Sequence, residues 1–152
     1  MKRSGDLLPL HILKLCVGVD DVPYLKALQK ARLKAMRDRG EKPRLTHVTR
    51  MFPRRAAKVL DGGSLYWVVK GMIQVRQRIL AFEEVITEDG IRKCGIVLDR
   101  KLVETEWRPR RPHQGWRYFL DEDAPPDRSA GPDADERLPE DMERELRTLG
   151  LI

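Results

Sequence analysis

Residues 72–85 constrain the fold more than any other part of the chain. Apolar and polar residues alternate there, and a period of two places successive side chains on opposite faces of a strand. An Asp89-Gly90 turn follows, and residues 91–98 have the composition of a returning strand, so residues 72–98 are predicted to form a β-hairpin. The alternating positions are Ile73, Val75 and Ile79 against Gln74, Arg76 and Arg78.

The remaining segments predict short strands and helices in alternation. We expect strands at residues 8–17, 45–50, 64–69 and 102–107 and a final strand near residue 119, with helices at residues 22–39, 54–60 and 138–149. In the first strand, Leu13 and Leu15 would lie on one face, and Lys14 and Cys16 on the other. This order predicts an α+β fold, in which a small, partly open β-barrel is flanked by short helices.

The length of the chain favours a single domain over residues 1–152. Residues 121–137 are rich in Asp, Pro, Gly, Ala and Ser, which is typical of a flexible acidic loop within such a domain. No apolar run is long enough for a membrane span, and the N-terminus does not have the pattern of a signal peptide. We therefore expect a cytoplasmic protein, with Cys16 and Cys94 as buried free thiols.

Charge is distributed unevenly along the chain. Residues 1–120 contain 26 Lys and Arg against 13 Asp and Glu, whereas residues 121–152 contain 4 against 11. A strongly basic body attracts polyanions, most often a nucleic-acid backbone. The alternative is that the acidic C-terminal segment folds back over the basic body.

Residues 108–119 form the first candidate binding segment, because two prolines and a glycine hold an extended path there. Arginine bonds phosphate in a bidentate manner, and exposed aromatic rings stack on unpaired bases. The predicted ligand-binding residues are Arg111, Gln114, Trp116 and Arg117. The alternative is that Trp116 belongs to the core and that the acidic segment neutralises the arginines.

Two further candidates add residues to this predicted surface. Arg50 and Arg54 lie at the junction between a strand and a short helix, where a helix N-terminus favours an anion. Trp67 follows Gly62-Gly63 and could form a pocket wall or part of the core, while Arg76 and Arg78 would extend the basic face of the hairpin. The glycines lack the spacing of a phosphate loop and are explained by turn formation.

The sequence contains none of the usual catalytic or metal-binding patterns. It has no Gly-x-Ser-x-Gly elbow, no His-Glu-x-x-His and no Cys-x-x-Cys, and its three histidines lack metal-ligand spacing. Glu83 and Glu84 would point to opposite faces of a strand. We expect no metal and no cofactor, and whether the protein is an enzyme stays open.

Four segments resemble an uncharacterised bacterial family, domain of unknown function 1489. They are His47-Val48-Thr49-Arg50-Met51, Gly62-Gly63-Ser64-Leu65-Tyr66-Trp67-Val68, Arg76-Gln77-Arg78-Ile79 and Arg111-Pro112-His113-Gln114-Gly115-Trp116-Arg117-Tyr118. The resemblance covers the chain from about Leu10 to the C-terminus, and His113 stands where an aromatic residue is expected. It implies no established activity or substrate.

The order of elements also resembles the PUA-like barrels, including the ASCH and EVE groups. This resemblance implies that RNA or a modified base would bind between a barrel and a helix. Our leading hypothesis is an RNA- or nucleotide-binding module with a basic, tryptophan-lined cleft. The alternatives are a small hydrolase acting on a modified nucleoside, with a lysine such as Lys70 near a threonine and a carboxylate, and a protein-interaction or dimerisation domain.

Overall fold

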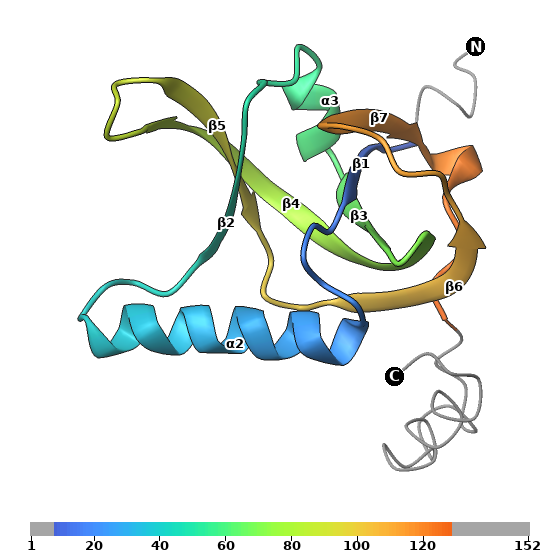
Figure 1. Cartoon of the computed structure of the whole chain (residues 1–152). Helices are drawn as coiled ribbons and strands as arrows, with labels where there is room; N and C mark the ends of the chain where they lie inside the picture. The colour runs from blue at the N-terminus through green and yellow to red at the C-terminus, as the bar shows by residue number, and fades with distance from the viewer. Residues whose placement is uncertain (1–7, 129–152) are drawn as a thin grey trace.

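The computed structural model describes residues 8–128 and confirms the α+β class (Figure 1). Seven strands form one mixed sheet, in which β1 and β3 run parallel and the other pairs are antiparallel. The elements are β1 (Leu10–Leu15), α2 (Val22–Asp38), β2 (Leu45–Thr49), α3 (Ala56–Leu60), β3 (Ser64–Val69), β4 (Met72–Ile86), β5 (Arg92–Leu98), β6 (Val103–Pro109), β7 (Trp116–Leu120) and the short 3₁₀ helix η1 (Asp121–Asp123).

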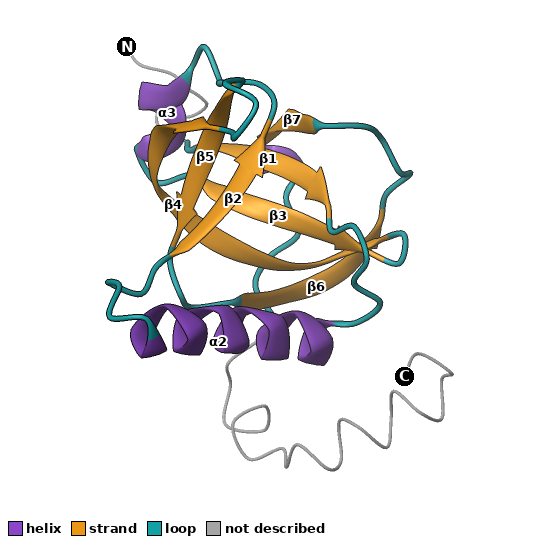
Figure 2. Cartoon of the chain, turned by 60° about the vertical axis from the view of Figure 1, so that its left-hand side comes forward, coloured by secondary structure: helices purple, strands orange, loops and turns teal. Residues whose placement is uncertain are grey.

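The predicted hairpin forms the centre of the sheet. β4 pairs with β3 along one half of its length and with β5 along the other, while β6 pairs with the same half as β3. The strand order is β2-β5-β4-β3-β1-β7, so β2 and β7 are the end strands, and the sheet does not close into a barrel within residues 8–128. Figure 2 shows that the sheet is strongly curved.

Helix α2 begins where the sequence predicts. Asp21 is its N-cap, and the Asp21 carboxylate accepts a hydrogen bond of 2.7 Å from the backbone N–H of Tyr24. Such a bond satisfies one of the free N–H groups at a helix start. The helix lies across one end of the curved sheet, and α3 lies at the opposite end (Figures 1 and 2). The helix predicted at residues 138–149 lies outside the described residues.

Each face of the sheet carries its own cluster of buried residues. The face with Ile12, Trp67 and Ile96, which we call the inner face, holds the larger cluster and is covered by α2. The opposite, outer face holds a smaller cluster formed by Leu13, Tyr66, Val68, Ile73 and Phe119. The predicted division of β1 is confirmed, since Leu13 and Leu15 pack on the outer face and Cys16 on the inner face.

The prediction that Ile73 shares a face with Val75 is wrong. Irregularities in the pairing of β4 fall between Ile73 and Val75 on the β6 side and opposite Trp67 and Val68 on the β3 side. Such a bulge shifts the alternation by one residue. Ile73 therefore packs on the outer face, while Val75 and Ile79 pack on the inner face.

Residues 121–128, the first part of the predicted acidic loop, lie along the outer side of the sheet. Backbone hydrogen bonds join Glu106 to Pro126 and Arg128 to Glu104, each at 2.9 Å. The Asp127 carboxylate binds the Arg76 guanidinium through two bonds of 2.7 Å. We call residues 121–128 the C-terminal strap. The rest of the predicted loop lies outside the described residues.

Candidate anion-binding pocket

A pocket of about 130 Å³ lies where the sheet leaves a gap between β1 and β2, with α2 as its third wall. β1 pairs with β7 only through residues 10–14, and β2 is an end strand, so no described strand fills this gap. The pocket is lined by Lys14, Leu15, Cys16, Val17, Val19, Leu25, Leu28, Gln29, Arg32, Leu45, Thr46, His47, Trp67 and Leu98. This lining combines an apolar floor with a basic rim and includes no aspartate or glutamate.

Lys14 and Arg32 are the two cations of the rim. Lys14 is two residues from both Ile12 and Cys16 along the chain, so its side chain lies with theirs on the inner face. Arg32 is exposed on α2. Neither side chain forms a salt bridge with a carboxylate among residues 8–128. Burial lowers the pKa of Lys14 from its ordinary value, because a desolvated ammonium without a counter-charge is disfavoured. The rim therefore carries positive charge that the described residues do not neutralise.

His47 projects from β2 into the same pocket. Its Nε2 atom is buried and has no hydrogen-bond partner among the described residues. Burial, followed by the charges of Lys14 and Arg32, lowers the pKa of His47 to about 4. The imidazole is therefore neutral at pH 7, and it offers a ligand one unused ring nitrogen.

The floor of the pocket is held rigid by a buried amide. The Gln77 side chain is fully buried, and its Oε1 accepts hydrogen bonds of 2.9 Å from Trp67 Nε1 and from Gln29 Nε2. Its Nε2 donates to Gln29 Oε1 and to the Asp99 carbonyl. Trp67 also meets the His47 ring edge-to-face at 5.0 Å between centroids. A fully bonded network of this kind orders the indole ring.

Both tryptophans predicted to bind ligand lie on the inner side. Trp67 lines the pocket but is only 4% exposed. Trp116 is the pairing partner of Lys14 across β1 and β7, which places the two side chains on the same face. Its Nε1 donates a hydrogen bond of 2.9 Å to the Met51 carbonyl, and its ring meets Tyr118 edge-to-face.

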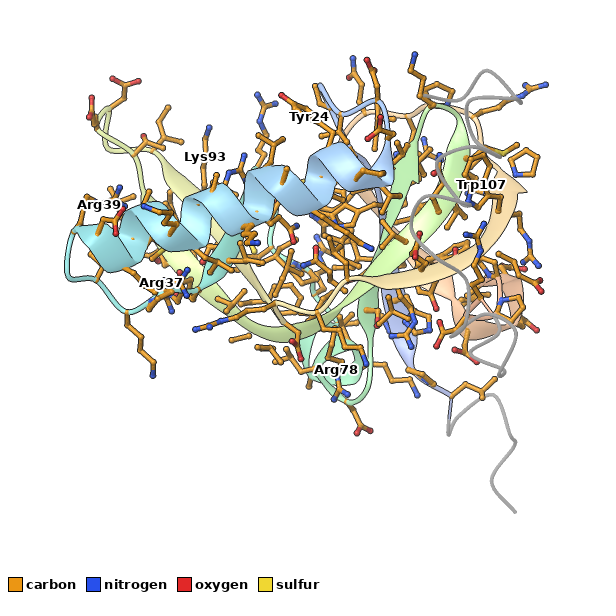
Figure 3. The ribbon with its side chains drawn as sticks, turned by 90° about the horizontal axis from the view of Figure 1, so that it is seen from below. Tyr24, Arg37, Arg39, Arg78, Lys93 and Trp107 are labelled. Atoms are coloured by element: carbon orange, nitrogen blue, oxygen red, sulfur yellow. The ribbon has the colours of Figure 1, made fainter. Side chains whose placement is uncertain are left out.

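Three of the predicted arginines lie on the outer face instead. Arg76 pairs with Tyr66, and Arg117 pairs with Leu13, both of which belong to the outer cluster. Arg78 follows Arg76 by two residues, as predicted, and is exposed. The structure therefore does not bring these arginines together with the tryptophans, because neighbouring strand residues point to opposite faces. Figure 3 shows Arg78 well separated from Trp107, the third tryptophan.

The remaining predicted residues are exposed side chains of loops. Arg50 and Arg54 flank a loop that β7 holds, since Trp116 bonds to Met51 and the Tyr118 hydroxyl accepts the Arg55 N–H at 2.9 Å. The junction that contains Arg50 and Arg54 and the candidate segment 108–119 thus lie side by side. Arg111 and Gln114 are exposed in the loop before β7 and are not part of the pocket lining.

Ser64, His11 and Asp121 lie in a row that has the residue types of a catalytic triad but not its geometry. His11 Nδ1 accepts a hydrogen bond of 2.9 Å from the backbone N–H of Ser64, not from its hydroxyl. His11 Nε2 lies 2.7 Å from the Asp121 carboxylate, and Arg76 donates to the Ser64 hydroxyl at 3.0 Å. Both His11 and Ser64 are buried. This arrangement fastens the C-terminal strap to the sheet.

Other kinds of site find no support among residues 8–128. No cluster of three His, Cys, Asp or Glu side chains in this region could hold a metal ion. Cys16 and Cys94 are buried free thiols, as predicted. Glu83 and Glu84 bind different arginines, Arg44 and Arg92. No helix in the described part of the chain is long and apolar enough to cross a membrane.

The sequence did not single out Lys14, Arg32 and His47 as a group. Arg32 is one of several basic residues on α2, and His47 has the pattern of a structural histidine. The available signal was Lys14, a charged residue inside a largely apolar strand. Such a residue is rarely buried without a partner.

One comparison with known proteins identifies a family. The family model described as "Protein of unknown function (DUF1489)" matches residues 12–152. No curated protein and no solved structure gives a significant match.

Proposed function

The chain belongs to this family of proteins of unknown function, and we propose that it binds a nucleotide unit of RNA in the pocket between β1, β2 and α2. The observation that carries the proposal is the pair of cations at the pocket rim, Lys14 and Arg32, which have no acidic partner among the described residues. A phosphate between them would supply the missing counter-charge.

The rest of the lining fits the other part of a nucleotide. The apolar floor can accept a flat base, and a ligand pocket typically combines such a floor with a few polar groups that set orientation. The unpartnered Nε2 of His47 is a polar group of the lining that is free to bond to the base. Trp116, beside Lys14, extends the aromatic wall toward the loop before β7.

The arrangement supports a finer description of the fold as a partly open, PUA-like barrel. In this proposal the gap between β1 and β2 is the opening of the barrel, and α2 covers it. We also propose a cytoplasmic location, because both cysteines are free thiols and a nucleotide unit of RNA is an intracellular ligand.

The two alternatives receive less support. A hydrolase would need a carboxylate beside Lys14 and Thr46, but the pocket lining contains none, and Lys70 instead lies 3.8 Å from Asp20 in the exposed turn region. A dimerisation domain would use a continuous apolar patch, whereas the observation that carries our proposal is a basic rim. We therefore propose binding without catalysis.

Titration of the four ribonucleoside 5′-monophosphates tests the proposal, with binding followed by calorimetry or by NMR. Lys14→Met and Arg32→Gln should each weaken binding by about tenfold or more, because each removes a charge-assisted hydrogen bond. Lys30→Met is the matched control, since Lys30 is exposed on α2 and is not part of the pocket lining. An absence of binding at low salt would contradict the proposal.

A further inference from the structure

A second hollow continues the pocket along α2. This groove, of about 370 Å³, is lined by Arg39, Arg44, Ala35 and Met36 and shares Arg32, Leu45 and Thr46 with the pocket. The shared residues make the two hollows neighbours along one line between α2 and β2. Their combined lining contains Lys14, Arg32, Arg39 and Arg44 and no acidic residue.

We propose that the pocket and the groove form one track for single-stranded RNA, with an unpaired base in the pocket and the adjoining phosphates at Arg32 and Arg39. This inference rests on the proposed nucleotide site and deepens it. It identifies the ligand as a strand of several nucleotides and not as a free nucleotide.

The spacing of the two arginines fits a repeating anion. Arg32 and Arg39 are seven residues apart, which is close to two helical turns, so they lie on nearly the same side of α2 and about 10 Å apart along its axis. Between them, Ala35 and Met36 present an apolar surface to the groove. Positive charges at both ends of an apolar strip match a chain in which phosphates alternate with nucleosides.

Arg39 is held by a carboxylate that a phosphate can replace. Its guanidinium binds Glu41 through bonds of 3.0 and 3.1 Å, and both side chains are largely exposed. An exposed ion pair of this kind contributes little to stability. Arg44 is also bound, to Glu83 at 2.8 Å. Arg32 forms no such pair among the described residues and connects the groove to the pocket.

The size and position of the pocket favour a single strand over a duplex. A base can reach the floor, between α2 and two strands, only when it is unpaired and unstacked. A duplex would have to turn a nucleotide out of its helix, which costs unpairing and unstacking energy. The same phosphates in a duplex would therefore bind less well.

The test compares oligoribonucleotides of one, two, three, four and six residues, together with a duplex of the same sequence. We expect the affinity to rise about tenfold from one to three residues and then to level off, with the duplex at least tenfold weaker than the single strand. Arg39→Gln should weaken trimer binding. It should also reduce the slope of log K against the logarithm of the salt concentration by about 0.7, which is the contribution of one phosphate contact in a single strand. Mononucleotide binding should be unchanged.

Two further variants sharpen the test. Arg37→Gln is the matched control, because Arg37 lies near Arg39 at the C-terminal end of α2 but does not line the groove (Figure 3). Glu41→Gln should strengthen trimer binding, because it removes the carboxylate that competes for Arg39, and a misfolded variant could not produce this gain.

The outcomes separate this inference from the proposed function. Equal affinities for one and three residues, both still dependent on Lys14, would overturn the track and leave the nucleotide site standing. Trimer binding that is insensitive to Arg39→Gln and Glu41→Gln, or duplex binding as tight as that of the single strand, would also overturn the track. No binding of any nucleotide would overturn both.

Discussion

Gln77 accepts the indole N–H of Trp67 at 2.9 Å, and this bond joins the centre of β4 to the floor of the pocket. The same oxygen accepts Gln29 Nε2, so one buried amide ties a strand, the neighbouring strand and α2 together. The pocket is therefore built on a rigid support, as a preorganised binding site requires.

Replacing this amide should destabilise the whole domain. Gln77→Leu leaves the Trp67 N–H and the Gln29 amide without their partner, and buried polar groups without partners cost about 1–3 kcal/mol each. We expect the free energy of unfolding to fall by about 2–4 kcal/mol in urea titrations. The double variant Gln29→Leu/Gln77→Leu should recover part of this loss. If Gln77→Leu were as stable as the natural chain, the amide network would have no structural role.

The buried histidines should make stability depend on pH. His11 and His47 both have a lowered pKa in the folded state, and burial is the main cause for each. Their neutral forms therefore stabilise the fold fully above about pH 6.5, the pKa of an unfolded histidine. This stabilisation is lost as the pH falls toward the folded pKa, because only the unfolded chain takes up the protons.

For His47 the pH window extends from about 6.5 to about 4. Across this window the free energy of unfolding should fall by about 3 kcal/mol. Unfolding by urea at pH 7, 6, 5 and 4.5 measures the loss, and His47→Gln should reduce it. Added nucleotide should raise the pKa of His47, because an anion in the pocket stabilises the imidazolium. NMR titration of the ring proton reports this shift directly, and an unchanged pKa would argue against an anion beside His47.

Gly63 occupies a position that no other residue can take without a shift of the backbone. A Cβ atom there would lie 2.2 Å from the Leu10 carbonyl oxygen and 2.4 Å from the Val59 carbonyl oxygen. We expect Gly63→Ala to lower the free energy of unfolding by more than about 3 kcal/mol.

Gly90→Ala is the comparison for Gly63→Ala. Gly90 has a φ of +79°, but a Cβ there meets nothing within 4 Å, so its replacement carries only the cost of an unfavourable φ, about 1 kcal/mol. Thermal unfolding of both variants checks the difference. Equal losses would mean that the close approach at Gly63 relaxes easily.

Arg76 should matter for stability and not for nucleotide binding. It lies on the outer face, where it holds Asp127 of the C-terminal strap. Arg76→Gln should release the strap, lower stability by about 1 kcal/mol and increase cleavage by trypsin after Arg128, while the affinity for nucleotides should change less than twofold. Arg78→Gln is the control, since Arg78 is exposed on the same face. A tenfold loss of affinity in Arg76→Gln would place a binding site on the outer face.

Local sequence patterns accounted for the elements but not for every face. The cap at Asp21 and the alternation along β4 predicted α2 and the hairpin, because capping and strand period are properties of neighbouring residues. The pattern could not predict the bulge beside Ile73, which depends on how β4 pairs with β6 and β3. Ile73 consequently falls on the face opposite to that of Val75 and Ile79.

The candidate site illustrates the same limit. The basic body of the chain was evident from composition, but the arginines expected to converge are divided between the outer face of the sheet and exposed loops. Trp116 and Arg117, adjacent in sequence, point to opposite sides of β7 because their partners are Lys14 and Leu13. No property of the segment alone indicated which of the two would lie on the inner face.

The sequence by itself determined an α+β chain with a strongly basic body, a capped first helix, a long hairpin and buried thiols. Only the tertiary structure decided which basic residues meet. Lys14, Arg32 and His47 come from β1, α2 and β2, and they line one pocket because the sheet stays open between β1 and β2 and α2 crosses the gap. Strand period and helix caps are set by near neighbours along the chain, whereas a pocket is set by the pairing and packing of distant segments.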